Sequence, residues 1–301
     1  MGGMVIPESL KPGARIRVIA PSSGFDRERF ERGIAWIRDS GWDPVFDERL
    51  FVRHRYLAGD DDHRISLVLE ALLDRSAAAL WCVRGGYGAT RIIERLGPAL
   101  RESPVRWLVG FSDITALHSA LARFGRVSMH GANITTLDEW EQTHREELFG
   151  MLRGEVIQQR FEGRVLHGTG THRGTLRGGN LAVLTALAGT GGLPSFEGAI
   201  VLLEDVGERP YRLDRSLTQL IRAKVFDGAA GFAIGQLSGC EVGNGADYDA
   251  LDVVVERLGE LGLPVLAGLP IGHDPGSRAA CLGARAELDL ERAQLDVAIG
   301  A

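Results

Sequence analysis

Three side chains with complementary chemistry stand where predicted strands end: Ser112, Glu204 and His273. A serine hydroxyl is a weak nucleophile at neutral pH and needs an adjacent base. That base needs a third group, which fixes its tautomer and stabilises its charged form. A histidine and a carboxylate can fill these two roles. The three residues therefore predict a catalytic triad in the chain order serine, glutamate, histidine.

Ser112 follows the apolar run 105–111, and the apolar residues after it recur at helical spacing up to Gly125. This pattern predicts a strand, a tight turn and a helix. It would place the serine at the carboxyl edge of a sheet, where open α/β sheets bind ligands. The G-x-S-x-G pattern of a nucleophile elbow is not met, because Ile114 stands at the second glycine position. A helix N-cap is the competing interpretation of Ser112.

The carboxylate and the histidine each follow an apolar stretch. Glu204 ends the run 200–203, and His273 follows residues 266–271 within a loop rich in glycine and proline. Taken singly, a capping or salt-bridging carboxylate and an ordinary loop histidine are the simpler interpretations. Their occurrence together with Ser112, each at a strand end, favours catalysis.

Acyl transfer also needs hydrogen-bond donors for the oxyanion of a tetrahedral intermediate. The backbone N–H of Asp113 lies at the predicted helix N-terminus and is free to donate. The turn 84–88 follows the preceding strand, and its glycines allow close backbone approach, so the N–H of Gly86 is the second expected donor. A phosphate-binding turn is the alternative, but Arg91 stands at the last glycine position of the dinucleotide fingerprint.

The elements that must position these residues are of two kinds. In the first half, strands are predicted at 15–20, 44–46, 78–83 and 105–111, and helices at 27–40, 60–73, 90–96 and 114–124. This alternation predicts a parallel sheet covered on both faces. Further on, strands are predicted at 173–177, 199–204, 231–237 and 285–290, with helices at 181–188, 213–223 and 249–258. That pattern predicts a smaller mixed α/β, barrel-like domain.

We therefore expect an α/β protein of two domains. The first domain would span residues 1–136 and carry the nucleophile, and 137–164 would be a polar connecting segment. The second domain would span residues 165–301 and carry the glutamate and the histidine.

Composition excludes several classes of protein. The 301 residues are 45% hydrophobic and 25% charged, as in ordinary soluble domains. The net charge of −6 argues against a nucleic acid or an anionic membrane as partner. Neither a membrane span nor a signal peptide is recognisable, so we expect a cytoplasmic protein. The three cysteines are odd in number and far apart, and they predict neither a disulfide framework nor a zinc site.

We expect neither a cofactor nor a metal. His167 and His172 lie five residues apart and could bind an ion, although a loop with two exposed histidines is the simpler interpretation. His118 is expected to be structural. His130 follows an apolar strand start and is a candidate for the lining of the cleft.

Six short motifs, in this order, resemble the LD-carboxypeptidase family of serine peptidases, which includes murein tetrapeptide carboxypeptidases and microcin C immunity proteins. They lie at residues 84–88, 110–113, 129–131, 178–181, 203–205 and 272–273. The resemblance implies an amino-terminal flavodoxin-like domain, a smaller carboxy-terminal domain and an active site between them. It also implies a metal-free enzyme that forms a homodimer.

The same resemblance implies roles for the site residues. Ser112 would be the nucleophile, His273 the general base and Glu204 its orienting carboxylate, with the amides of Gly86 and Asp113 as the oxyanion hole. Glu208 is the alternative carboxylate. We prefer Glu204, because it ends the strand whereas Glu208 lies in the following polar loop.

The reaction implied by the resemblance is release of the terminal D-alanine from a murein tetrapeptide, by hydrolysis of an L-to-D amide bond. Such an enzyme must recognise a free carboxylate, which arginine binds with a bidentate fork. We expect Arg84 and Gly85 of the glycine-rich turn to bind substrate, with Arg209 and Arg212 as alternatives for the carboxylate. Asn180 could bind the peptide backbone or could equally be a helix N-cap.

Two other functions remain open. One is a microcin C immunity-type hydrolase that cleaves peptidyl or aminoacyl nucleotides, which needs a surface for stacking a nucleobase. Trp140 is a weak candidate for that surface. The other is an inactive relative that only binds muropeptides, against which the complete set of serine, glutamate and histidine argues.

Overall fold

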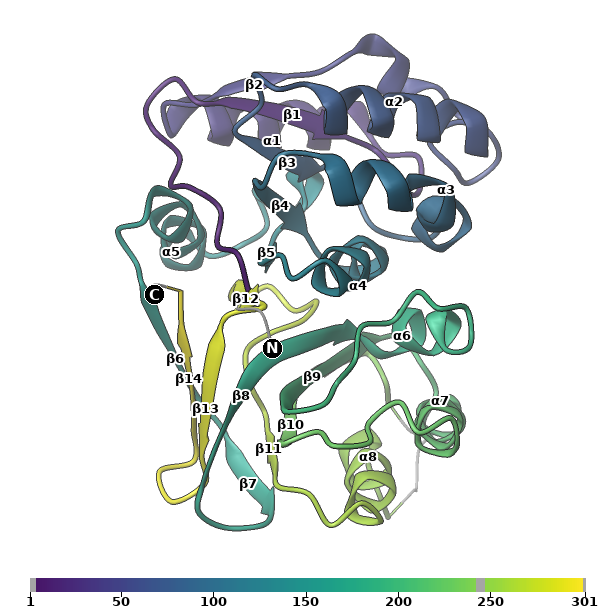
Figure 1. Cartoon of the computed structure of the whole chain (residues 1–301), viewed down its shortest axis with the longest axis vertical. Helices are drawn as coiled ribbons and strands as arrows, with labels where there is room; N and C mark the ends of the chain where they lie inside the picture. Colours follow the sequence, from purple (N-terminus) through teal and green to yellow (C-terminus); the bar gives the residue numbers. More distant parts are fainter. Residues whose placement is uncertain (1–3, 242–246, 300–301) are drawn as a thin grey trace.

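The computed structural model describes residues 4–241 and 247–299, so the predicted outer boundaries 1 and 301 lie outside this part. Two sheets and their helices make up the molecule, the first in the upper half of Figure 1 and the second in the lower half. The chain thus has the α/β class that the sequence predicts.

The first sheet has six strands in the order β12-β5-β4-β3-β1-β2. They are β1 (Arg15–Ile19), β2 (Asp43–Val45), β3 (Ala79–Cys82), β4 (Trp107–Gly110), β5 (Ser128–His130) and β12 (Ala280–Leu282). The first five are parallel, and their order is that of a flavodoxin-like sheet. The sixth, β12, comes from the carboxy-terminal part of the chain and pairs antiparallel with β5. The flavodoxin-like sheet is therefore confirmed, and a distant segment completes its edge.

Helices cover both faces of this sheet, as predicted. They are α1 (Arg27–Asp39), α2 (Asp61–Leu73), α3 (Ala89–Glu102), α4 (Thr115–Arg123) and α5 (Gln142–Arg153), with short 3-10 turns at Glu48–Phe51, Ser112–Ile114 and Ile134–Thr136. Alternate strand residues point to opposite faces. Trp81 packs with the α1 and α5 side, whereas its neighbours Leu80 and Cys82 pack with α2, α3 and α4.

Helix α3 is longer than the predicted segment 90–96, because it continues through Pro98 to Glu102. Proline in a helix interior removes one backbone hydrogen bond. Leu96 and Leu100 are both buried. Tertiary burial of this apolar face thus outweighs the local preference to stop.

The second sheet has eight strands in the order β6-β14-β13-β8-β9-β10-β11-β7. They are β6 (Gln158–Glu162), β7 (Arg164–His167), β8 (Thr171–Asn180), β9 (Ala199–Val206), β10 (Gly231–Ser238), β11 (Val265–Ala267), β13 (Arg285–Asp289) and β14 (Gln294–Ala298). Strands β8 to β11 are parallel, and the remaining pairings are antiparallel.

The second domain is mixed α/β, as predicted, but its barrel-like sheet is not a closed barrel. Its two edge strands, β6 and β7, are separated in sequence by Gly163 alone, yet no pairing joins them in the described part of the chain. The sheet therefore bends round towards itself without closing. Strand β6 was not predicted because it exposes alternate polar residues and buries only Gln159 and Phe161, and β7 was not predicted because none of its residues is fully buried.

Helices α6 (Leu181–Leu187), α7 (Pro210–Arg222) and α8 (Ala250–Gly259) cover one face of the second sheet and enclose an apolar core with β9 and β10. Residues from the opposite face, such as Leu202, belong to the same buried cluster as the α1 side of the first sheet. The two sheets therefore share a core, to which β12 also contributes.

Within the described ranges, no helix combines the length and apolar character needed to cross a membrane. Cys82, Cys240 and Cys281 are all buried and free. They fill the interior as small apolar side chains.

Candidate active site

The carboxyl ends of parallel strands from both sheets meet at one cavity. Ser112 follows β4 and Gly85 follows β3, while His273 comes from the loop after β11. All three line a cavity of about 250 Å³. The structure thus brings the predicted serine and histidine, from opposite sheets, to a common space.

Ser112 has a strained backbone. Its φ is +66°, in the left-handed region that residues other than glycine rarely adopt. It is the first residue of the 3-10 turn that leads into α4, and the N-cap of this turn is Phe111, with no side chain as cap. The N-cap interpretation of Ser112 is therefore wrong. A serine held in strain between a strand and a helix has the geometry of a nucleophile elbow.

Two glycines shape the neighbouring turn, and the first of them lets its backbone approach Ser112. A Cβ atom on Gly85 would lie 2.8 Å from Cβ and 3.1 Å from Oγ of Ser112. Gly86 has φ of +94°, and a Cβ atom there would lie 2.4 Å from Oγ of Ser23. Because Gly85 has no room for a side chain, the backbone of this turn lies directly beside Ser112, while Gly86 packs against Ser23.

The two predicted oxyanion donors are available. In the described residues, the amides of Gly86 and Asp113 donate to no protein acceptor. The side chain of Asp113 is engaged elsewhere, because its Oδ2 accepts from the hydroxyl of Ser22 at 2.6 Å and from the amide of Ala89 at 2.8 Å. Burial raises the pKa of this carboxyl group above its usual value. Asp113 therefore ties the turn after β1 and the start of α3 to the nucleophile turn.

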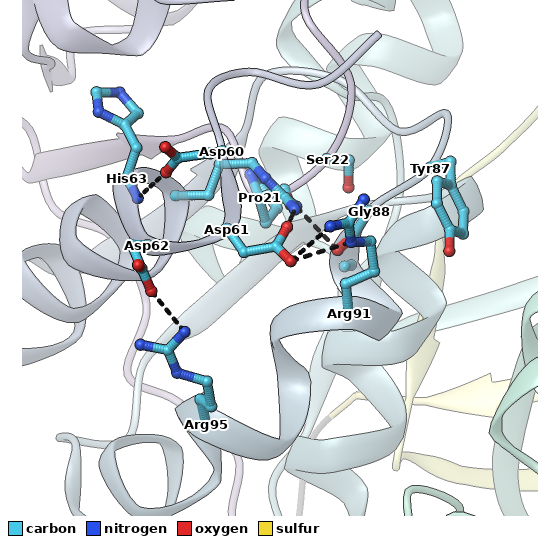
Figure 2. A network of polar contacts seen from close by, with 12 residues as sticks. Pro21, Ser22, Asp60, Asp61, Asp62, His63, Tyr87, Gly88, Arg91 and Arg95 are labelled. Atoms are coloured by element: carbon cyan, nitrogen blue, oxygen red, sulfur yellow. Dashed lines mark hydrogen bonds and ion pairs between the residues drawn. The ribbon is translucent and has the colours of Figure 1, made fainter. Parts of the chain in front are cut away.

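A buried arginine supports the same turns from behind. The guanidinium of Arg64 is fully buried and donates to the carbonyl oxygens of Pro21 and Gly88, the latter at 2.8 Å. It also pairs with Asp61. Asp61 in turn binds Arg91 at 2.7 Å, a contact that Figure 2 shows. This network was not predicted, because no local pattern distinguishes Arg64 from a surface arginine of an amphipathic helix.

His273 is paired with Glu204. Its Nδ1 lies 2.7 Å from Oε2 of that carboxylate, which is fully buried. Burial opposes the charge of Glu204, but the hydrogen bond from His273 and the nearby imidazole of His130 outweigh it and lower the pKa of Glu204 to about 2. Because an ionised carboxylate can only accept, Nδ1 of His273 is the donor, which leaves Nε2 for the serine.

The same pair sets the ionisation of the histidine. Burial disfavours the imidazolium of His273, yet the hydrogen bond and charge of Glu204 raise its pKa above the ordinary value. The alternative carboxylate, Glu208, lies 3.4 Å from Arg212 instead. The structure therefore brings Glu204, and not Glu208, to His273.

Two further histidines lie near the site. His118 is buried, and its ring nitrogens bond the hydroxyl of Ser128 and the carbonyl of Gly110, both at 2.8 Å. Burial lowers its pKa to about 3, and its role is structural, as predicted. His130 does not line the cavity: it is 1% exposed and lies behind Glu204, with its Nε2 atom 3.8 Å from Oε1.

Arg84 lies on the cavity wall. Its guanidinium donates to the carbonyl of Gly24 at 2.7 Å, and no ion pair joins it to a carboxylate in the described ranges. Arg29 lines the same cavity but is paired with Glu139. Arg209 and Arg212 are exposed and do not line this cavity. Of the two arginines that line this cavity, Arg84 is therefore the one whose charge is not already paired with a carboxylate in the described ranges.

A second cavity of about 320 Å³ is also lined by Ser112, together with Asn180 and Glu208, among others. Asn180 is the N-cap of α6, because its Oδ1 accepts from the amide of Val183. Its Nδ2 donates to Asp205 at 3.1 Å, so both polar ends of the side chain have protein partners. Burial, helped by the charge of Glu204, raises the pKa of Asp205 to about 6.

A glutamine anchors the histidine loop. Oε1 of Gln236, on β10, accepts from the amide of Asp274 at 3.0 Å and from the hydroxyl of Ser277 at 2.7 Å. Its backbone amide also donates to Ile271. This residue was missed, because the two partners lie about forty positions further along the chain.

Three other candidates from the sequence lie away from the cavity. Trp140 is 7% exposed and belongs to the apolar core, so it presents no free face to a base. His167 and His172 each bond a backbone carbonyl. In the described part of the chain, no three metal-ligating side chains gather into a candidate metal site.

At one cavity of a two-domain α/β fold, a strained serine meets a histidine that is paired with a buried carboxylate, and the amides of Gly86 and Asp113 beside the serine are free. Residues 16–131 match the LD-carboxypeptidase N-terminal domain, and residues 173–288 match the LD-carboxypeptidase C-terminal domain. The chain belongs to the LD-carboxypeptidase family and is a hydrolase.

Individual relatives agree with this assignment. A relative from Synechocystis sp. that bears a carboxypeptidase name is 37% identical over 94% of both chains. The murein tetrapeptide carboxypeptidase of Pseudomonas aeruginosa is 32% identical over 92% of this chain and 94% of its own length. The crystal structure of muramoyltetrapeptide carboxypeptidase from Oxalobacter formigenes superposes with a TM-score of 0.83 at 26% identity, covering 95% of this chain and 99% of the other.

The microcin C7 self immunity protein MccF has a similar fold. Its wild-type apo structure has a TM-score of 0.86 and covers 98% of both chains, at 20% identity. At this identity the likeness concerns the fold alone.

Proposed function

We propose that this protein is a serine LD-carboxypeptidase that releases the terminal D-alanine of murein tetrapeptides. The observation that carries the proposal is the cavity lined by Ser112, Gly86 and the Glu204-paired His273. The amide of Gly86, and that of Asp113 directly after the serine, are both free to donate. The name of the Pseudomonas aeruginosa relative supports a murein peptide as the substrate.

In the proposed mechanism, Nε2 of His273 takes the proton of the Ser112 hydroxyl as Oγ attacks the carbonyl carbon of the scissile amide. Glu204 holds Nδ1 and stabilises the imidazolium, and the amides of Gly86 and Asp113 bind the oxyanion. His273 then protonates the leaving amine of D-alanine. Water, deprotonated by His273, attacks the ester and restores the serine. These groups supply every proton transfer that the reaction needs, so the proposed chemistry uses no metal.

The proposed ligand of the terminal carboxylate is Arg84. It stands on the wall of the nucleophile cavity, and its charge has no carboxylate partner among the described residues. An exposed guanidinium can offer two parallel N–H donors to a carboxylate. Gly85 gives the peptide room to approach the serine, because it has no side chain. Asn180, as a helix cap in the second cavity, would contact substrate only through its remaining donor capacity.

The deciding experiment is mass spectrometry of two reactions with purified protein. One contains a murein tetrapeptide that ends in D-alanine, and the other a peptidyl-sulfamoyl adenylate. We expect the loss of one alanine from the first substrate and no cleavage of the second. Cleavage of the second alone would assign an immunity-type hydrolase, for which the buried Trp140 offers no stacking face. Light scattering would test the homodimer, which we also propose.

A further inference from the structure

His130 and Glu204 face each other, and each has a polar atom that lacks a partner. His130 is 1% exposed and Glu204 is fully buried. Nε2 of His130 lies 3.8 Å from Oε1 of Glu204, and neither atom has a hydrogen-bond partner among the described residues. Buried polar atoms are almost always paired in folded proteins. The two atoms are therefore each other's natural partners.

We propose that His130 is a positioning residue, which donates a hydrogen bond from Nε2–H to Oε1 of Glu204 while Oε2 holds His273. The carboxylate would then be fixed between two histidines, and its orientation towards the base would be set at both oxygens. Catalytic hydrogen bonds are often long without substrate and shorten in the complex. The inference rests on the proposed function, because the orientation of His273 matters only if His273 is the base.

The place of His130 in the fold gives this contact a second consequence. His130 is paired with Gly110 of β4 and with Ala280 of β12, so it belongs to the sheet that carries the nucleophile. Glu204 belongs to the other sheet. The hydrogen bond therefore joins the two sheets at the reacting groups. It would hold His273 at a fixed position relative to Ser112.

The pH behaviour of this cluster depends on all the ionisable groups around it. Those facing His273 are Glu204, Asp205 and Asp274, and those next to His130 are Glu204 and His118. His118 is uncharged at neutral pH, since its pKa is about 3. Without the donor from His130, the carboxylate of Glu204 can turn away from His273, and a weaker hydrogen bond to Nδ1 supports the imidazolium less. The pKa of His273 then falls, and the acid limb of the activity profile moves to lower pH.

A matched pair of variants tests this role. Methionine and glutamine are both unbranched and similar in length, but only glutamine carries an N–H donor near the position of Nε2. For His130→Met we expect kcat on the tetrapeptide to fall about 10- to 100-fold with KM unchanged, because a buried carboxylate oxygen loses its donor. The acid limb of kcat/KM should shift to lower pH. His130→Gln should restore most of kcat and the original limb.

A double variant shows whether His130 acts through Glu204. In a Glu204→Gln background, His130→Met should cause little further loss, because the carboxylate that it positions is already gone. A folded His130→Met protein with full kcat and an unmoved pH profile would overturn the proposal. Fully additive losses in the double variant would also overturn it.

The wild-type protein provides a test that does not depend on the folding of a variant. Long-range ¹H–¹⁵N spectra at mildly alkaline pH should show His130 protonated at Nε2, with the signal assigned by its loss in His130→Gln. Protonation at Nδ1 instead would overturn the inference. Hydrolysis by a Ser112→Ala protein has a different meaning, since it would overturn the proposed function itself whatever the His130 variants do.

Discussion

The two sheets contribute to the site in different ways. The first sheet contributes backbone geometry: the strained Ser112 and the free amides of Gly86 and Asp113. The second sheet contributes charge, through the buried carboxylate of Glu204 and its partner His273. Changes to the backbone geometry around Ser112, on the edge of the first sheet, should therefore alter the rate without moving the pH profile. Changes to the charged pair on the edge of the second sheet, or to His130 behind it, should move the profile as well.

Two buried histidines show why the second edge depends on pairing. His118 bonds only neutral groups, and burial lowers its pKa to about 3. His273 is also largely buried, but the charge of Glu204 raises its pKa. Burial alone removes a histidine from chemistry near neutral pH, and an adjacent carboxylate restores it.

The largest effect is expected on the first edge. Ser112→Ala removes the proposed nucleophile and should lower kcat by about 10⁴-fold or more, with the fold and the melting temperature retained. The measurement is the alanine released from the tetrapeptide by the variant and by the wild type at equal protein concentration. Normal turnover by a purified, folded Ser112→Ala protein would contradict the triad.

On the second edge, Glu204→Gln should lower kcat by about 10³- to 10⁴-fold, because an amide can favour the wrong tautomer of His273 and does not stabilise its charge. The wild type needs neutral His273 and should lose activity as the pH falls through a value above the ordinary ~6.5. Without the carboxylate the pKa of His273 drops, so the residual activity should persist to lower pH. Glu208→Gln is the control. If it were the more damaging change, the wrong carboxylate would have been assigned.

Gly85→Ala separates backbone geometry from charge. The new Cβ atom would lie 2.8 Å from Cβ of Ser112. We expect kcat to fall about 100-fold, as for a nucleophile displaced by roughly 1 Å, while the acid limb stays in place. Gly97→Ala on α3 is the control, since its Cβ atom would meet nothing within 4 Å and activity should not change. A shifted pH profile in Gly85→Ala would contradict the claim that backbone changes beside Ser112 alter the rate alone.

Arg84→Ala tests the proposed carboxylate ligand. It should lower kcat/KM for the tetrapeptide by about 10- to 100-fold, the value of a charge-assisted hydrogen bond. The same variant should have little effect on a tetrapeptide whose terminal carboxylate is amidated. An equal loss on both substrates would show that Arg84 serves the fold of the turn, through its bond to Gly24, rather than the carboxylate.

The smallest effect is expected at the loop that carries His273. Gln236→Leu removes the acceptor of Asp274 and Ser277 and should lower the stability by about 1–3 kcal/mol. Because the loop loses its anchor, kcat should fall only several-fold. Thermal unfolding and kinetics measure the two effects together. Gln236→Glu keeps the acceptor and should recover both, and its failure to do so would show that another contact sets the loop.

Part of the fold followed from local patterns. Helical spacing ending at glycine and apolar strand runs predicted the parallel strands and most helices, because one buried face leaves its period in the sequence. The pattern failed where burial alternates with charge, as in β6, and where packing overrides a breaker, as at Pro98. Pairing of β12 with β5 could not be predicted, since about 150 residues separate the partners Ala280 and His130.

The available chemistry could be predicted from the amino-acid sequence: a serine, a carboxylate and a histidine at strand ends, and glycines where a turn must come close. These are properties of single residues and their immediate neighbours. The tertiary structure decided which carboxylate meets His273, that His130 stands behind it, and that Asn180 caps a helix while Trp140 is buried. Those outcomes depend on how two sheets pack, and packing brings together residues that no local pattern relates.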